Sequence, residues 1–470
     1  MYIIILYEVI TILKVNDIIN VIITEISASG TGFAIYEDYP LFIAGGVTGD
    51  ELSVQVTKTN KNYGFAKIVS IQKASALRVN PPCPSFEKCG GCDLMHINYA
   101  SQLEIKQGYV KNNLKRIAGL NESDYIFDGI SGADNEFYYR NKAQFPVAMH
   151  NGKAVCGFYE QKTHKVVPCL NCMIQNKEIN KTVNIILDFI NENKISVYNE
   201  KTHKGIVRHI YVRCAEPDGG EIMATVVTNT GKELKNYKDL ADKLSAQVKL
   251  SGLIQNINTE KSNVILGRKN IVLFGCDTLN VKLDGLSFKI SPHSFFQVNY
   301  MQMQKLYQKA IEYAQIEKTD TVFDLYCGVG SISLYAARYA KKVVGVEIID
   351  AAVKNAKANA TESGIDNAEF FAGDCPEITR ELLNNGYSAD IVIVDPPRKG
   401  CDESLLALIN EISPKRLVYV SCNSSTLARD IVILKEYGYT LKKLHCVDMF
   451  CQSTHVESVA LLTLSTTKFA

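Results

Sequence analysis

The sequence of 470 residues predicts an α/β protein with three parts: a small all-β barrel of the OB type, a mixed α+β region, and a doubly wound sheet. Three observations predict this order. Short strand patterns crowd the first 73 residues, a mixed region follows over 74–290, and apolar strands alternate regularly with helices over 291–470. The length itself favours two to four domains.

The first 13 residues are strongly apolar and are expected to stand apart from the barrel. They lack a basic leading segment and a small-residue cleavage site, Glu8 interrupts them, and they are too short to span a bilayer. We interpret 1–13 either as an extra leading strand or as an upstream start. No other segment approaches a membrane span, so we expect a cytoplasmic protein without a membrane partner. Nothing in the sequence indicates an obligate protein partner.

The overall composition excludes several classes of protein. A hydrophobic fraction of 46% and a charged fraction of 21% are those of an ordinary globular protein. The net charge of +1 gives no support for a nucleic-acid partner, which must be argued from local sites. Fourteen cysteines in so long a chain favour metal binding in a reducing compartment over a secreted disulfide framework.

Residues 14–73 are punctuated by Gly, Pro, Asn and Asp, and the short apolar runs between them predict strands. Five short strands in so few residues are typical of a small OB-type barrel. Cations interleaved with Tyr63 and Phe65 suit single-stranded RNA, although a purely structural barrel is the alternative. The predicted strands are 17–23, 31–36, 41–43, 51–56 and 65–69, and the cations are Lys58, Lys61, Lys67 and Lys73.

The central region, 74–290, opens with a cluster of cysteines. A long helical pattern over 100–117 follows the cluster, and β-like stretches lie at 206–213 and 221–227. There is no internal repeat and no low-complexity segment. These features predict a mixed α+β domain.

Near-continuous apolar strands that alternate with helices define the C-terminal part, 291–470. Such strands are buried on both faces, which is typical of a parallel sheet covered by helices on its two sides. The predicted strands are 321–325, 342–347, 390–395, 416–420 and 459–464, and the predicted helices are 331–339 and 351–362.

A Gly-containing loop, 324–330, joins the first of these strands to a helix. Glycines at such a turn allow the backbone to approach a ligand closely. The three-glycine dinucleotide fingerprint is not met, because Ser333 stands where the third glycine would be. Glu347 ends the next strand, roughly 20 residues on, where a carboxylate holds ribose hydroxyls. The combination favours S-adenosylmethionine over a pyrophosphate cofactor; a plain tight turn is the alternative.

A later strand ends in Asp395-Pro396-Pro397-Arg398. Ligands of such sheets bind outside the carboxyl ends of the strands, so Asp395 is expected to face the crevice. Methyltransferases that act on exocyclic amines of bases resemble this motif but follow the prolines with a stacking aromatic. Arg398 occupies that place here, which disfavours amine methylation.

Cys422 follows the strand 416–420, and Glu457 lies just before the terminal strand. Carbon C5 of a pyrimidine is a poor nucleophile, and addition of a thiolate to C6 activates it. A general base must then remove the C5 proton. Taken alone, Cys422 reads as an inert core cysteine and Glu457 as a surface carboxylate.

Five motifs in order resemble the RNA (uracil-5-)methyltransferase family: Ser-Pro-x-Ser-Phe-Phe-Gln-Val-Asn at 291–299, Asp-Leu-Tyr-Cys-Gly-Val-Gly at 324–330, Asp-Pro-Pro-Arg at 395–398, Tyr-Val-Ser-Cys-Asn at 419–423, and Asp-Met-Phe with His-Val-Glu within 448–457. The resemblance covers nearly the whole chain. It implies that the doubly wound sheet is a class I methyltransferase domain and that 14–73 is a TRAM domain that holds RNA.

The same resemblance assigns roles to individual residues. It implies that Cys422 is the nucleophile and Glu457 the base. It also implies an S-adenosylmethionine pocket lined by Gln297, Tyr326, Glu347 and Asp395. Without the family pattern, Gln297 reads as a structural amide.

Three cysteines lie within ten positions at Cys83, Cys89 and Cys92. Thiolate sites of this kind take zinc or an iron–sulfur cluster, and spacing alone does not choose between them. The resemblance implies a [4Fe–4S] cluster with Cys172 as the fourth ligand. Cys169 is the alternative fourth ligand, because spacing does not assign thiol ligands. Methyl transfer needs no electrons, so a structural or RNA-docking role is favoured.

The favoured function is uridine C5 methylation in 23S rRNA, because the barrel and the cysteine cluster precede the catalytic domain as in ribosomal members. Three other functions compete with it. Methylation of tRNA is the first. Cytosine C5 methylation is the second, but its Pro-Cys dipeptide is absent from the catalytic domain. A non-catalytic RNA-binding iron–sulfur protein is the third, and intact Cys422 and Glu457 argue against it.

Overall fold

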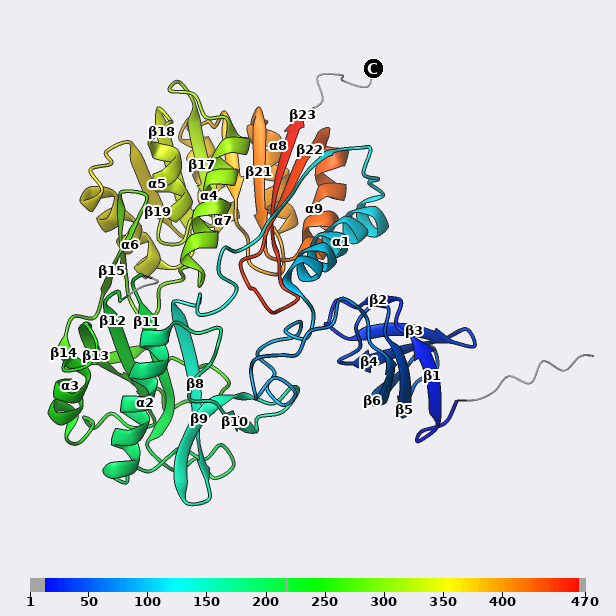
Figure 1. Ribbon diagram of the computed structural model, residues 1–470. Coiled ribbons are helices and arrows are strands. Elements are labelled where there is room, and N and C mark those ends of the chain that lie inside the picture. The colour runs from blue at the N-terminus through cyan, green and yellow to red at the C-terminus, as the bar shows by residue number, and fades with distance from the viewer. Residues whose placement is uncertain (1–12, 217–218, 465–470) are drawn as a thin grey trace, which may run out of the picture. The chain divides into compact units, whose positions relative to one another are not determined.

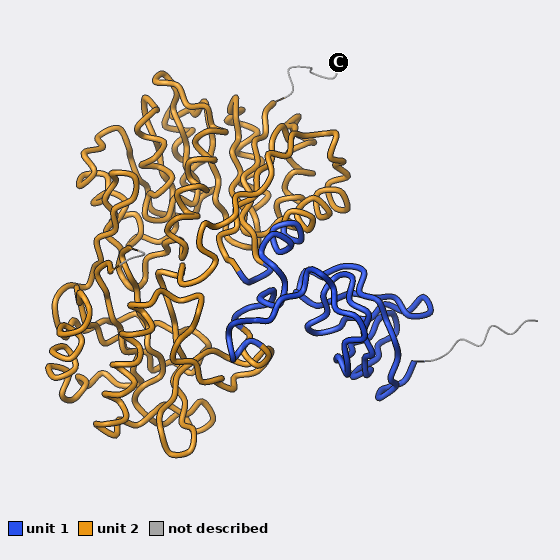
Figure 2. The backbone as a smooth tube through the Cα atoms, in the orientation of Figure 1, with its two compact units in different colours: residues 1–86, 91–106, 452–454 blue, residues 87–90, 107–451, 455–470 orange. Residues whose placement is uncertain are grey.

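The computed structural model describes residues 13–216 and 219–464 (Figure 1). The prediction for the apolar extension therefore falls outside the described residues, apart from Leu13. The chain divides into two compact units (Figure 2). Unit 1 comprises 1–86, 91–106 and 452–454, and unit 2 comprises 87–90, 107–451 and 455–470.

Unit 1 is built on one six-stranded sheet of order β1-β5-β6-β4-β3-β2. All pairings are antiparallel except β4 with β6. Alternate side chains of the strands, among them Ala34, Leu41 and Val54, are fully buried in its core. The strands are β1 (Ile18–Ile22), β2 (Glu25–Ile26), β3 (Gly32–Tyr36), β4 (Tyr39–Ala44), β5 (Glu51–Thr59) and β6 (Gly64–Lys73).

A second sheet, wholly within unit 2, has the order β10-β9-β8-β11-β12-β13-β14. Helix α2 packs on β9 and β11, and α3 packs on β13 and β14. The strands are β8 (Lys142–His150), β9 (Lys153–Tyr159), β10 (Val166–Pro168), β11 (Val207–Cys214), β12 (Ile222–Thr228), β13 (Leu250–Ile257) and β14 (Lys269–Gly275); the helices are α2 (Lys177–Glu192) and α3 (Tyr237–Ser245).

The third large sheet has the order β19-β18-β17-β20-β21-β23-β22-β7. Its first five strands are parallel, and β23 is antiparallel to both neighbours. The strands are β7 (Ile126–Ser131), β17 (Thr321–Leu325), β18 (Lys342–Glu347), β19 (Ala368–Ala372), β20 (Ile391–Val394), β21 (Arg416–Ser421), β22 (Tyr439–Val447) and β23 (Glu457–Leu464).

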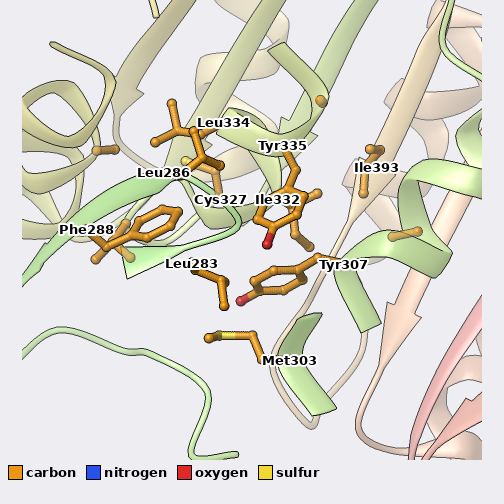
Figure 3. Packing of buried hydrophobic residues seen from close by; sticks show 14 of the residues in the cluster. Leu283, Leu286, Phe288, Met303, Tyr307, Cys327, Ile332, Leu334, Tyr335 and Ile393 are labelled. Carbon is orange, nitrogen blue, oxygen red and sulfur yellow. The ribbon is translucent and has the colours of Figure 1, made fainter. Parts of the chain in front are cut away.

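Helices cover both faces of this sheet (Figure 1). In β20, Ile391 and Ile393 belong to one buried cluster, whereas Val392 and Val394 belong to the other. Figure 3 labels Ile393, Tyr307 and Ile332 among the side chains of the first cluster. The helices are α1 (Tyr99–Ala118), α4 (Tyr300–Ala314), α5 (Ser331–Ala337), α6 (Asp350–Glu362), α7 (Cys375–Asn384), α8 (Glu403–Ile412) and α9 (Ser424–Glu436); the hairpin β15 (Leu279–Leu283) and β16 (Leu286–Ile290) precedes α4.

The predicted fold class is confirmed: an all-β barrel-type sheet, a mixed central sheet and a doubly wound sheet follow one another along the chain. Three details differ from expectation. The sheet of unit 1 has six strands rather than five, because the short strand β2 pairs with β3 at its edge. The terminal strand begins at Glu457 rather than at 459, because Glu457 pairs with Val447. Strand β7, far earlier in the sequence, joins the edge of the last sheet. The predicted domain boundaries stay a prediction. Within the described residues, no helix is long and apolar enough to cross a membrane.

Candidate active site

Strand pairing brings Cys422 and Glu457 together. Strands β21 and β23 are antiparallel, and their last pair is Ser421 with Ser458. Cys422 directly follows the last residue of β21, and Glu457 is the first residue of β23. The two residues therefore lie at the same end of the paired strands, close enough for the Glu457 charge to act on the Cys422 thiol.

The backbone around Cys422 is held by its two neighbours. The Ser421 hydroxyl accepts a hydrogen bond from the Asn423 N–H at 3.1 Å and donates one to the Asn423 carbonyl at 3.0 Å. The Asn423 side chain caps α9 by accepting from the Ser425 N–H and donates to the Arg398 carbonyl at 3.0 Å. The N-cap therefore fixes the thiol loop and ties it to the Asp-Pro-Pro-Arg loop.

The charges around the thiol are unusual for a reactive cysteine. Burial, followed by the nearby carboxylates of Glu457 and Asp395, raises the pKa of Cys422 to about 11, while Arg398 acts in the opposite direction. Glu457 is only 2% exposed. Burial, together with Asp395 and against Arg398, raises the pKa of Glu457 to about 8. Its Oε2 atom has no hydrogen-bond partner among the described residues.

The Gly-containing loop and Glu347 form one bonded group. The Gly328 N–H donates to Glu347 Oε2 at 3.1 Å, and the Ile349 N–H donates to Oε1 at 2.9 Å. Gly328 and Gly330 both have left-handed backbone, with φ of 57° and 81°, which suits glycine at this tight turn before α5. The Glu347 carboxylate thus lies beside the backbone of the loop.

Two further buried carboxyls lie at the ends of adjacent strands. Burial raises the pKa of Asp324 to about 7, against hydrogen bonds from the Ser333 hydroxyl and N–H. The other oxygen, Asp324 Oδ1, has no hydrogen-bond partner in the described parts of the chain. Burial and the Asp324 charge also raise the pKa of Asp395 to about 7. The carboxyl ends of these strands therefore carry buried acidic groups, one of which has an oxygen without a hydrogen-bond partner. Such a set of groups is typical of a ligand site.

The other two predicted cofactor residues differ in their surroundings. Gln297 is buried, and its backbone carbonyl accepts from the Asn141 side chain at 3.0 Å. Tyr326 has left-handed backbone with φ of 69°, and its N–H donates to the Val346 carbonyl. Burial raises the pKa of Tyr326, whose ring packs with the cluster that includes Cys375 and Cys401. Among the described residues, neither side chain is hydrogen-bonded to the Glu347 carboxylate, which accepts from the Gly328 and Ile349 N–H groups instead.

Tyr307 is a site residue that the sequence did not reveal. Its hydroxyl is hydrogen-bonded to the Ser331 side chain and lies within electrostatic range of Asp395 and Glu457. Its ring makes an edge contact with Tyr335 at 5.6 Å between centroids, and Figure 3 shows both rings in the buried cluster. A tyrosine on the apolar face of a helix reads as core, so no local pattern could have indicated its place.

The predicted cluster cysteines are distributed over both units: Cys83 and Cys92 belong to unit 1, and Cys89 and Cys172 belong to unit 2. Within the described ranges, no group of three or more Cys, His, Asp or Glu side chains is arranged to hold a metal ion. The Cys172 thiol interacts with Cys169, and that hydrogen bond together with backbone N–H groups of Ile174 and Gln175 lowers the pKa of Cys172.

The four predicted cysteine ligands are thiols, the residue type that binds zinc or an iron–sulfur cluster. Gly90 leaves no room for a Cβ atom without displacing a neighbour, because the Tyr159 carbonyl would lie 3.0 Å from it. Its N–H donates to that same carbonyl at 2.9 Å. A tight turn between Cys89 and Cys92 is therefore built into the chain, and Cys172 has donors that stabilise a thiolate.

Comparison with known proteins identifies the two parts of the chain. The family model "tRNA (Uracil-5-)-methyltransferase" matches residues 98–465, and the TRAM domain model matches residues 13–69. A protein of Clostridium tetani named as an uncharacterized RNA methyltransferase is 42% identical over 451 residues, covering 96% of this chain and 97% of that protein. A relative of the same description from Listeria innocua is 42% identical and covers 97% and 99%.

Among solved structures, the Pyrococcus abyssi tRNA (uracil-54, C5)-methyltransferase in complex with S-adenosyl-L-homocysteine superposes with a TM-score of 0.74 and 28% identity. The match covers 94% of this chain and 99% of that one. Both the resemblance read from the motifs and the predicted enzyme class are thereby confirmed. The chain belongs to the tRNA (uracil-5-)-methyltransferase family, carries a TRAM domain, and is an S-adenosylmethionine-dependent RNA methyltransferase.

Proposed function

We propose that the protein transfers a methyl group from S-adenosylmethionine to C5 of a uridine in 23S rRNA. One observation carries the chemical part of this proposal: the pairing of β21 with β23 sets Cys422 opposite Glu457, with Arg398 in electrostatic range of both. A nucleophile and a buried base on the same face are what C5 methylation of a pyrimidine requires.

In the proposed reaction, Cys422 Sγ forms a bond to C6 of the uracil, and the C5–C6 double bond becomes an enolate. Bound S-adenosylmethionine would supply the methyl group that C5 accepts, and breaking of its sulfur–methyl bond would leave S-adenosylhomocysteine. Glu457 removes the C5 proton, the double bond re-forms, and the C6–S bond breaks to release Cys422 as a thiolate. The base begins as a carboxylate and ends protonated, and the thiolate is regenerated.

The electrostatics of the pair fit this order of events. The Glu457 charge contributes to the raised pKa of Cys422, so a thiolate is disfavoured while Glu457 is a carboxylate. Formation of the C6–S bond converts the sulfur into a neutral thioether. This change removes one negative charge from the neighbourhood of Glu457 and favours its carboxylate form at the step where a base is needed.

The cofactor is proposed to bind at the carboxyl-terminal ends of β17, β18 and β20. Glu347 is proposed to hold the ribose hydroxyls, since its carboxylate already lies against the Gly328 backbone. Asp395, Gln297 and Tyr326 are proposed to complete the pocket. Buried Asp395 is expected to accept hydrogen bonds from bound ligand, which would offset part of its burial.

The barrel of unit 1 offers a surface suited to RNA. Cross-strand pairs place Phe33 beside Phe42, Phe42 beside Phe65, and Phe65 beside Lys58. The aromatic rings lie 5.5–5.8 Å apart, and Tyr63, in edge contact with two of them, is 41% exposed. Half-exposed rings with a flanking cation are the elements that stack and hold unpaired bases.

Ribosomal RNA and tRNA are the two candidate substrates. The order of barrel, cysteine cluster and catalytic domain favours 23S rRNA, whereas the family description and the Pyrococcus abyssi enzyme favour tRNA. Deleting the gene is expected to remove 5-methyluridine from 23S rRNA and to leave tRNA unchanged, as measured by mass spectrometry of both RNAs. Re-expression of the wild-type protein should restore the modification. Loss from tRNA alone would reject the ribosomal substrate.

We also propose that Cys83, Cys89, Cys92 and Cys172 hold a [4Fe–4S] cluster with a structural or RNA-docking role. The four-thiol donor set, the tight turn at Gly90 and the stabilised thiolate of Cys172 support it. Protein purified without oxygen is expected to be brown and to contain about four iron atoms per chain. The Cys172→Ala variant should lose iron, while Cys169→Ala should keep it. A colourless protein that contains zinc would overturn the assignment.

A further inference from the structure

A cavity of about 380 Å³ lies in unit 2, apart from the thiol and the carboxylates of the active site. Its walls come from four places in the chain: the segment 133–139, the start of α2, the start of α4, and Gly219. The volume falls within the range of ordinary ligand sites. The polar groups and aromatic rings in its walls indicate what it would bind.

Aromatic side chains dominate one wall. Phe137, Tyr138 and Tyr300 all line the cavity and are only partly buried. The Lys177 ammonium lies 5.1 Å from the centroid of the Tyr138 ring, which is a cation–π contact. Among the described residues Lys177 makes no ion pair, so its charge is available to a ligand. A planar ring beside a free cation is the combination that binds a base and its phosphate.

The acidic side chains that line the cavity do not neutralise the positive charge of Lys177. Asp134 is paired with Lys305 at 3.1 Å, and the same lysine donates to the Gly132 carbonyl. Glu178 lies in the first turn of α2 and also lines the wall. A carboxylate in that place accepts hydrogen bonds from the N–H groups of a base, which adds selectivity rather than repulsion once Lys177 meets the phosphate.

The aromatic segment is hydrogen-bonded on both sides to segments with predicted roles. The Tyr138 N–H donates to the Met173 carbonyl at 2.7 Å, directly after Cys172. The Asn141 N–H donates to the Val298 carbonyl at 2.8 Å, directly after Gln297. Tyr138 also has left-handed backbone with φ of 55°, which is uncommon for a tyrosine. The wall of the cavity is thus hydrogen-bonded to the segment that carries Cys172, and the residues that follow it are hydrogen-bonded to the segment that carries Gln297.

We propose that this cavity binds one unpaired nucleotide of the RNA substrate, distinct from the uridine that is methylated. The base stacks on Tyr138 and its neighbours, and Lys177 meets the phosphate. This inference rests on the proposed function, because it assumes an RNA that reaches the Cys422 site. It makes the cavity a specificity site: only an RNA that can expose a second nucleotide at the right separation is held in register.

The test compares Tyr138→Ala, Tyr138→Phe and Lys177→Ala in the RNA that the wild-type enzyme methylates. Tyr138→Ala is expected to raise KM for RNA about tenfold with kcat nearly unchanged, while Tyr138→Phe keeps the ring and stays near wild type. Lys177→Ala should reduce the slope of log affinity against log salt by about one. The dissociation constant for S-adenosylmethionine should not change in any of them.

The double variant Tyr237→Ala/Lys238→Ala is the matched control, since it removes a tyrosine and a lysine from the first turn of α3 instead. It should leave KM within about twofold of wild type. Ultraviolet cross-linking of RNA containing 4-thiouridine should join the segment 133–139 to a nucleotide other than the methylated one. KM values for Tyr138→Ala and Lys177→Ala that both match the control would overturn the proposal.

The outcome is separable from that of the proposed function. If the wild-type enzyme methylates RNA and the cavity variants bind RNA normally, only the cavity proposal fails. If the wild-type protein binds RNA but methylates no uridine, the proposed function fails, and filter-binding affinities of the same variants still decide whether the cavity holds RNA. Should Tyr138→Ala not fold, the exposed Lys177→Ala change carries the test.

Discussion

Replacing Cys422 by alanine is expected to abolish RNA methylation while S-adenosylmethionine still binds. Without a thiolate at C6, carbon C5 of uracil remains too poor a nucleophile to accept the methyl group. We expect methyl transfer to fall by at least about 10³-fold, measured with tritiated S-adenosylmethionine in a single-turnover assay. Isothermal titration should give a dissociation constant for the cofactor close to that of the wild type.

The structure provides the controls for this variant. Cys422 is half-buried, and the bonds that fix its loop come from Ser421 and Asn423 rather than from the thiol, so the loop should survive the change. Cys276 is an exposed thiol outside the site, and Cys276→Ala should retain full activity. Undiminished methylation by Cys422→Ala would exclude covalent catalysis by this residue.

The order of elements in the last sheet was predictable because its strands are apolar runs with sharp ends. The segments 321–325 and 342–347 coincide with β17 and β18. A charged residue precedes each strand, β17 runs into the glycine loop and β18 ends at Glu347, so local chemistry determines their borders. The pairing of Gly328 with Glu347 follows from the same local rule, since both lie at carboxyl ends of adjacent parallel strands.

Long-range pairing is what the sequence could not supply. Nothing local to Glu457 indicates that its strand inserts between β21 and β22, and it is that insertion which buries the carboxylate opposite Cys422. Strand β7 likewise joins the edge of the sheet although it lies almost two hundred residues before β17 in the sequence. The Tyr307 hydroxyl reaches Ser331 only because α4 packs on the sheet. Of these, the motif resemblance supplied a role for Glu457 alone, and the strand order explains how its carboxylate is buried.

The second large effect is expected from Glu457→Gln, which should trap the enzyme on its RNA. Addition of Cys422 to C6 and methylation at C5 need no base, but release needs removal of the C5 proton. The amide cannot accept it. Turnover should fall by about 10²–10⁴-fold, and a methylated protein–RNA adduct should accumulate. The adduct is detected as a tritium-labelled band that withstands denaturing electrophoresis and moves to the mobility of the free protein after ribonuclease treatment.

A double variant identifies the bond that holds this adduct. Cys422→Ala/Glu457→Gln should form none, because the sulfur that links protein to RNA is gone. Glu436→Gln, a change of the same kind at an exposed position of α9, should behave as wild type. Normal turnover by Glu457→Gln, or binding of both substrates without any adduct, would remove Glu457 from the role of base.

The pH dependence of stability gives an independent check that Glu457 has the buried surroundings described. Its pKa in the folded protein, about 8, lies above the ordinary value of 4.5. Between these values the folded state keeps a proton that the unfolded state has lost, so the free energy of unfolding falls as pH rises from 4.5 to 8. Glu457→Gln removes this contribution, on the order of a few kcal/mol. The melting temperature of the variant should therefore decline less than that of the wild type between pH 5 and pH 8.5. The decline that remains is expected from Asp324 and Asp395, because their pKa values are raised in the same direction.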